Sequence, residues 1–165
     1  METMLFKHTF IAVALFIFAT SAKAENSYAF SALEKEMDRI ANQYSRDSSE
    51  LLNQMSKLLD NSPSATNAER ALFLTYDCSI RARMASTLAQ DRLSELKSLA
   101  VIDDTADVRA AISLCESGIA SQKEDLTDYN LASIKAFYHV REAKLPTLRY
   151  WIGLNAYSIL LQYNE

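Results

Sequence analysis

Residues 66–85, TNAERALFLTYDCSIRARMA, decide the fold. They open with a capping box, in which the Thr66 side chain accepts from the amide of Glu69 and the Glu69 side chain reaches back to the amide of Thr66. The apolar residues that follow cover more than one side of a helix: Leu72, Phe73, Leu74, Tyr76, Cys78, Ile80, Met84 and Ala85. A helix that is apolar around most of its circumference is buried. We therefore expect a helix from 66 to about 99 whose first half is central.

Three further helices are expected around it. The capping box of Ser31 and Glu34 predicts one helix from 31 to about 59, which Pro63 terminates. Its apolar stripe recurs every seven residues at Phe30, Met37, Tyr44, Leu51 and Leu58. A short helix is expected from 148 to 163. Because the 165 residues include only 2 Gly and 2 Pro, a turn-rich β fold is excluded. The predicted fold class is all-α, an antiparallel helical bundle of about four helices, three long and one short.

The remaining long helix has two interpretations. Gly118, followed by a second capping box at Ser121 and Glu124, indicates a stop and a fresh start. Against this, the apolar residues keep one seven-residue phase through the glycine, at Ile112, Ile119, Leu126 and Val140. A break would normally reset that phase. We favour one continuous helix from about 105 to 144, with Asp104 as its N-cap.

The first 24 residues predict an export signal. Lys7 and His8 give a basic start, an apolar run of about 11 residues follows, and Ala22-Lys23-Ala24 has small residues where signal peptidase requires them. The apolar run is shorter than the roughly 20 residues that span a bilayer. We expect a cleaved signal peptide at 1–24 and a single helical domain at 25–165. The protein should be periplasmic or secreted, with no stable membrane anchor.

The cysteines constrain how the helices connect. An exported chain with two cysteines predicts one disulfide, Cys78–Cys115, the alternatives being two free thiols or a bridge between chains. In a plain antiparallel hairpin that turns near residue 102, the two would lie about 11 residues out of register, roughly 16 Å of helix. Either the helix that begins at 66 ends early, near residue 91, or residues 99–104 run back along the bundle in extended form. We favour the extended connection.

The charge balance excludes one class of partner. Removing Lys7, Lys23 and Glu2 with the signal from 17 basic and 21 acidic residues leaves a net charge near −5. Nucleic-acid binding depends on an excess of Lys and Arg that faces phosphates. We expect no nucleic-acid partner.

The chain offers little for catalysis or metal binding. His139, with Glu142, gives the His and Glu of a carboxylate-bridged metal site only once and in reverse order. The acidic clusters lack the spacing and glycine of a calcium loop and are interpreted as helix-start and solvated charges: Asp103, Asp104 and Asp107, then Glu124, Asp125 and Asp128. No catalytic residue, metal site or cofactor is predicted, and we expect a protein that is not an enzyme.

Two short segments resemble a haem protein. Leu33-Glu34-Lys35-Glu36-Met37 and Tyr138-His139 are similar to the ligand neighbourhoods of small periplasmic four-helix cytochromes, which hold haem b without covalent attachment. In that family a Met early in the first helix and a His late in the last bind the iron. The resemblance covers about seven residues and implies Met37 and His139 as the ligands. A continuous helix from 105 to 144 would place these two residues at opposite ends of the bundle.

The C-terminal stretch from Tyr150 to Tyr163 carries no charge. A helix of this composition is either buried or part of an interface. Because Tyr and Trp commonly anchor interfaces, Tyr150, Trp151 and Tyr157 are the candidate contacts with another protein or a second copy of the chain.

The predicted function is that of an exported, non-enzymatic protein-binding protein, such as a cognate inhibitor or immunity protein or an assembly chaperone. An acidic bundle suits this role because it can complement a basic partner. A small-ligand or haem carrier is the alternative.

Overall fold

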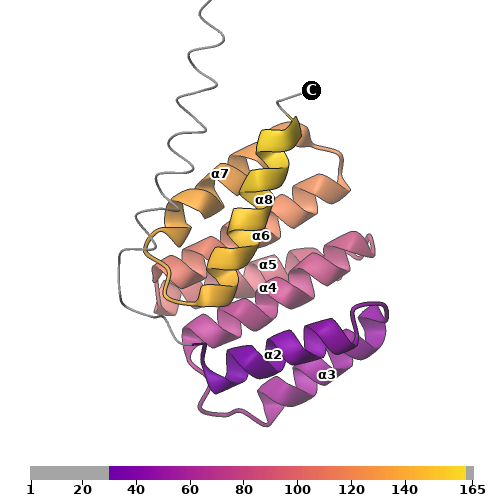
Figure 1. Ribbon diagram of the computed structural model, residues 1–165, viewed down its shortest axis with the longest axis vertical. Helices are drawn as coiled ribbons and strands as arrows, with labels where there is room; N and C mark the ends of the chain where they lie inside the picture. The colour runs from indigo at the N-terminus through magenta and orange to yellow at the C-terminus, as the bar shows by residue number, and fades with distance from the viewer. Residues whose placement is uncertain (1–29, 163–165) are drawn as a thin grey trace, which may run out of the picture.

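The computed structural model describes residues 30–162, with side chains from 30 to 154, and the regular secondary structure in this part of the chain is all helical (Figure 1). Its helices are α2 (Ala32–Gln43), α3 (Ser48–Asp60), α4 (Asn67–Arg83), α5 (Leu88–Ile102), α6 (Ala106–Gln122), α7 (Leu126–Val140) and α8 (Pro146–Gln162). The all-α prediction is confirmed. The expected number of about four helices is wrong, because each predicted long helix is two shorter ones. The predicted signal peptide lies outside the described residues.

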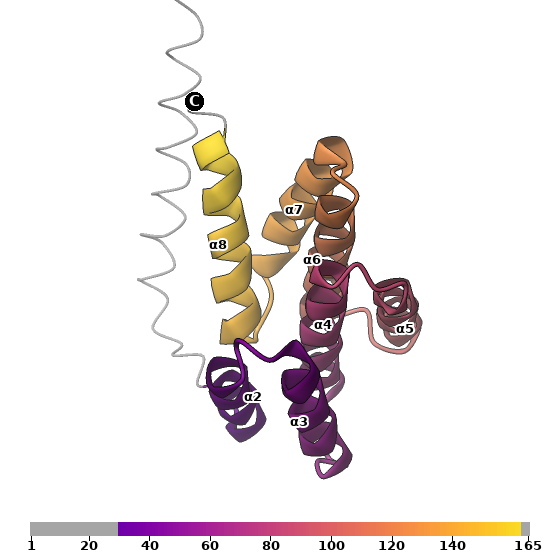
Figure 2. The same cartoon turned by 90° about the vertical axis from the view of Figure 1, so that its right-hand side faces the viewer.

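The helices form a central layer that is covered on both faces. α3, α4, α6 and α7 lie side by side in that order, α2 and α8 cover one face of the layer, and α5 covers the other (Figures 1 and 2). Because α5 returns along the layer between α4 and α6, these two central helices point in the same direction. The purely antiparallel arrangement expected from the sequence is therefore wrong at the centre. None of the described helices is long and apolar enough to cross a membrane.

The first predicted helix breaks between Tyr44 and Asp47. Asp47 is the N-cap of α3, and its carboxylate accepts from the amide of Glu50 at 3.0 Å. The apolar stripe keeps its phase across the break because α3 folds back onto α2 and both helices turn their apolar sides to one core. Met37 and Leu51 of the stripe are buried, together with Ile40 and Met55 on the same two helices.

The end of α4 is a Schellman motif without glycine. Ala85 has a φ of 54°, in the left-handed region. The amide of Ser86 donates to the carbonyl oxygen of Arg81 at 2.9 Å, and the amide of Ala85 donates to that of Ala82 at 3.0 Å. These bonds satisfy carbonyls that a helix end leaves free. An L-residue in this conformation costs roughly 1–2 kcal/mol, so such stops are normally marked by Gly.

The break between α6 and α7 uses the same motif. Glu124 has a φ of 57°, and the amide of Asp125 donates to the carbonyl oxygen of Ala120 at 3.1 Å. The continuous helix from 105 to 144 is thus wrong, and so is a stop at Gly118, which lies inside α6. The N-cap of α6 is Thr105 and not Asp104.

The predicted disulfide between Cys78 and Cys115 is present, with Cα atoms 5.7 Å apart and both residues fully buried. Residues 99–102 are helical, so the extended connection is wrong; α4 ends at Arg83, even earlier than the alternative had placed the end. Because α4 and α6 are parallel, the twelfth residue of one and the tenth of the other lie at similar heights. The offset of about 11 residues that an antiparallel pair would have does not arise, because the two helices run in the same direction.

α4, α5 and α6 enclose the disulfide in a cluster of their own. The buried side chains around it are Ala71, Ala82, Ala89, Leu93, Leu96, Val108, Ala111 and Ile119. Two ion pairs join α5 to its neighbours. Arg92 Nε lies 3.2 Å from the buried Asp77 carboxylate of α4, and Lys97 Nζ lies 2.9 Å from the carboxylate of Glu116 of α6. The larger core, on the other face of the layer, includes α2 and α8.

The left-handed Ala85 predicts a stabilising glycine. Ala85→Gly should raise the free energy of unfolding by about 1 kcal/mol, because glycine adopts this conformation without the Cβ clash. Ala41→Gly, inside α2, should lower it by about 0.5–1 kcal/mol. Urea unfolding measures both, and a loss of stability in Ala85→Gly would contradict the assigned helix stop.

Removal of the disulfide should be costly. The cysteines are 37 residues apart, and the chain-entropy estimate for such a loop is about 4 kcal/mol. Cys78→Ala with Cys115→Ala should therefore lower the free energy of unfolding by about that amount. The reduced wild-type chain is the matched control, and a variant as stable as the oxidised protein would overturn the expectation.

Candidate functional site

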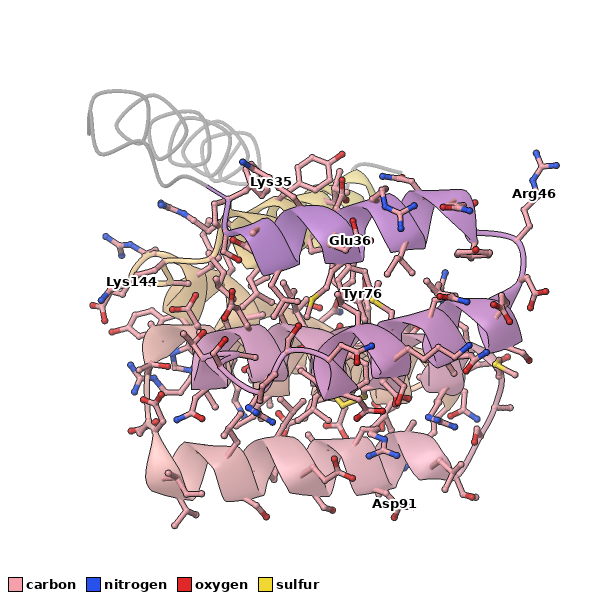
Figure 3. All side chains as sticks on the ribbon, turned by 90° about the horizontal axis from the view of Figure 1, so that it is seen from below. Lys35, Glu36, Arg46, Tyr76, Asp91 and Lys144 are labelled. Atoms are coloured by element: carbon pink, nitrogen blue, oxygen red, sulfur yellow. A yellow bond between two sulfur atoms is a disulfide. The ribbon has the colours of Figure 1, made fainter. Side chains whose placement is uncertain are left out.

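Two buried carboxylates hold the start of α8 in place. Asp107, in the first turn of α6, accepts from the amides of Lys144 and Leu145 at 2.9 and 2.8 Å. Glu34 of α2 accepts from the amide of Thr147 at 3.3 Å. Amides at a helix start have no partner within the helix, and a carboxylate is favoured there by the helix dipole. Lys144 itself extends outward at this end of the molecule (Figure 3).

A third carboxylate joins α2 to α4 at the same end. The hydroxyl of Ser31, the N-cap of α2, donates to Glu69 Oε1 at 2.6 Å. The other oxygen of Glu69 accepts from the amide of Thr66 at 2.8 Å. Burial raises the pKa of Glu69, but the hydrogen bonds from Ser31 and Thr66 outweigh it, so the pKa is lowered. The first turns of α2, α4, α6 and α8 are therefore linked through acidic side chains.

The inner side of α8 packs on the core. Leu148 and Ile152 are fully buried. Trp151 is half-buried, and its ring meets that of Tyr76 edge to face, with centroids 4.0 Å apart. Tyr76 lies in the interior of the bundle (Figure 3), where burial, followed by the charges of nearby acids, raises its pKa. Trp151 is thus placed as a packing residue.

The outer side of α8 is exposed and apolar. Tyr150 is 65% exposed and Leu154 is 48% exposed. No charged residue follows Arg149 until Glu165. Tyr157 belongs to α8, but its side chain lies outside the part that the structure describes. Of the three predicted contacts, Tyr150 is the one whose side chain is both described and at the surface; Leu154 was missed by the sequence analysis.

Two open grooves flank α5. One, of about 610 Å³, lies between α3, α4 and α5, and the other, of about 300 Å³, lies between α5, α6 and α7. The apolar residues that line the larger groove include Leu59, Phe73 and Leu99, and Arg70 and Arg92 also line it. None of the described side chains of α8 lines either groove, so the candidate contact Tyr150 and the grooves are separate surfaces.

The two residues of the cytochrome resemblance lie on different helices, α2 and α7. Met37 is fully buried in the larger core, and His139 is half-buried on α7. Neither lines the two grooves. Burial, and then the charge of Arg109, lowers the pKa of His139.

Three residues of the acidic clusters have structural roles. Asp104 pairs with Arg109 at 3.0 Å, Asp107 accepts the amides before α8, and Asp125 caps α7 by accepting from the amide of Asp128. Within residues 30–154, no group of three or more His, Cys, Asp or Glu residues is arranged to hold a metal ion.

No protein-family model matches the chain, and neither the curated proteins nor the solved structures give a significant match.

The position of Trp151 predicts a loss of stability on truncation. Trp151→Ala should lower the free energy of unfolding by about 2 kcal/mol, since it removes a half-buried indole and its contact with Tyr76. Tyr150→Ala, one residue away but exposed, should change it by less than about 0.5 kcal/mol. Equal stability of the two variants in urea unfolding would contradict the inward placement of Trp151.

The lowered pKa of Glu69 predicts part of the acid sensitivity. A carboxylate whose folded pKa is depressed stabilises the protein above its ordinary pKa of 4.5, and this stability is lost as the pH falls through the folded pKa. Glu69→Gln should therefore lose less stability than wild type between pH 7 and acidic conditions below 4.5. Glu142→Gln, which changes an exposed carboxylate just after α7, is the control. Parallel stability curves for Glu69→Gln and wild type would show that the Ser31 bond is not formed in solution.

Proposed function

We propose that this chain is an exported, non-enzymatic protein-binding protein and that the outer side of α8 is its contact with a partner protein. A cognate inhibitor or immunity protein and an assembly chaperone are the two kinds of protein that we have in mind. Both act by covering a surface of another protein and need no reacting groups of their own.

The exposed, uncharged side of α8 carries this proposal. An exposed aromatic and an exposed leucine, on a stretch of helix that carries no charge after Arg149, have the composition of the centre of a protein interface. Tyr150 supplies a large rigid contact with a polar tip, and Leu154 supplies apolar area one turn further along. The buried bonds at the start of α8 support the role as well, because they fix the direction of the helix before any partner arrives.

The buried disulfide supports the exported part of the proposal. Disulfides form and persist mainly in the periplasm and outside the cell. The bond between Cys78 and Cys115 lies in the centre of the fold. Its formation is compatible with folding in such a compartment.

Tyr150→Ala tests the proposed contact. The oxidised protein is used to capture partners from a periplasmic extract, and the captured partner is then purified and titrated against the wild type and the variant. If Tyr150 anchors the interface, its removal should weaken binding by about tenfold or more.

Val101→Ala is the matched control. Val101 is 87% exposed and lies on α5, on the opposite face of the layer from α8 (Figure 2). It should bind the partner as the wild type does, and both variants should keep the wild-type melting temperature. Equal affinity of Tyr150→Ala and wild type for the purified partner would remove α8 from the proposed contact.

A further inference from the structure

The outermost helix of the central layer has an apolar outer side. α7 is the last helix of the layer, next to α6 (Figures 1 and 2). On the side of α7 opposite its buried residues lie Leu131, Ile134 and Tyr138, which are 50%, 62% and 69% exposed. Their spacing of three and four residues makes one continuous stripe along the helix.

The other edge of the layer is different. α3 is the first helix of the layer, and its exposed residues are all polar: Ser49, Asn53, Ser56, Lys57 and Asp60. A helix at the end of a stack of helices needs such a polar outer side for solubility. α3 meets this requirement and α7 does not, so α7 has the character of a helix that another helix covers.

The charges beside the stripe identify the helix that would cover it. Asp128 and Lys135 are exposed and lie seven residues apart on the same flank of the stripe, about 10 Å from each other along the helix. Neither side chain has an ion pair among the described residues. The midpoint of Leu131 and Ile134 falls between residues 132 and 133, near the centre of α7, and the two opposite charges lie on either side of it.

We propose that this edge of the layer binds a second copy of the chain, with the two α7 helices antiparallel about a twofold axis at that midpoint. In this register Leu131 lies against the partner's Ile134, and Tyr138 lies against the partner's Thr127. Asp128 lies within one turn of the partner's Lys135, and the symmetry forms the same ion pair twice. A twofold interface requires a surface that complements itself, and the order of charged and apolar residues along α7 provides one.

A membrane surface fits this stripe less well. Helices that lie on anionic membranes have Lys and Arg predominating on their polar side. The charges here alternate in sign, with Asp128 and Lys135 on α7 and Glu142 just after it, and the whole chain has a net charge of −4. The proposed dimer uses α7 and not the outer side of α8, so it stands independently of the proposed function.

Sedimentation equilibrium of the oxidised protein tests the dimer. Small interfaces are typically weak, so we expect a monomer–dimer equilibrium between about 10 µM and 1 mM. Ile134→Glu places two charges at the centre of the interface and should leave the protein monomeric over that range. Asn53→Glu makes a similar exposed change on α3 and should leave the equilibrium unchanged.

A charge exchange tests the register. Lys135→Asp replaces two attractions by two repulsions and should weaken dimerisation by roughly tenfold. Adding Asp128→Lys should restore the wild-type affinity. A protein that is monomeric at 1 mM, a dimer that Ile134→Glu leaves intact, or a charge exchange that fails to restore association would each overturn the proposal. If the wild type is monomeric and Ile134→Glu no longer captures a partner protein, the stripe binds that other protein and not a second copy of the chain.

Discussion

The parallel contact between α4 and α6 is the feature on which the rest of the structure depends. Both helices are buried on most sides, and the disulfide between Cys78 and Cys115 joins them at their middles. α5 must return along the layer for the two helices to run the same way, which leaves α5 alone on one face. α3 and α7 then become the two edges of the layer, and α2 and α8 cover the remaining face.

Buried carboxylates connect this core to the surface that we propose for binding. Asp107 belongs to α6 and accepts hydrogen bonds from the two amides just before α8. The start of α8 is therefore held at a fixed place relative to α6. Glu34 adds a bond from α2. A carboxylate that accepts two amides is a strong, oriented connection. The direction of α8, and with it the exposure of Tyr150, therefore follows from the packing of the central helices.

Local signals predicted much of the fold, and the missing parts have physical causes. The capping boxes of Ser31 and Thr66 are present, as is the disulfide. The breaks at Ala85 and Glu124 were missed because neither left-handed residue is glycine, and the apolar phase continued because both helices of a hairpin face one core. Once those breaks were missed, the parallel direction of α4 and α6 could not be predicted. The absence of charge on α8 indicated an unusual helix. It did not indicate which of Tyr150 and Trp151 faces outward.

A distance measurement between spin labels tests the parallel pair most directly. Arg83 and Gln122 are exposed at the C-terminal ends of α4 and α6, and Thr105 is exposed at the start of α6. Neighbouring helix axes lie about 8–10 Å apart, whereas a helix of 17 residues is about 25 Å long. With the native disulfide closed, labels at 83 and 122 should be clearly closer than labels at 83 and 105. The reverse order would mean that α4 and α6 are antiparallel and would contradict the fold described above.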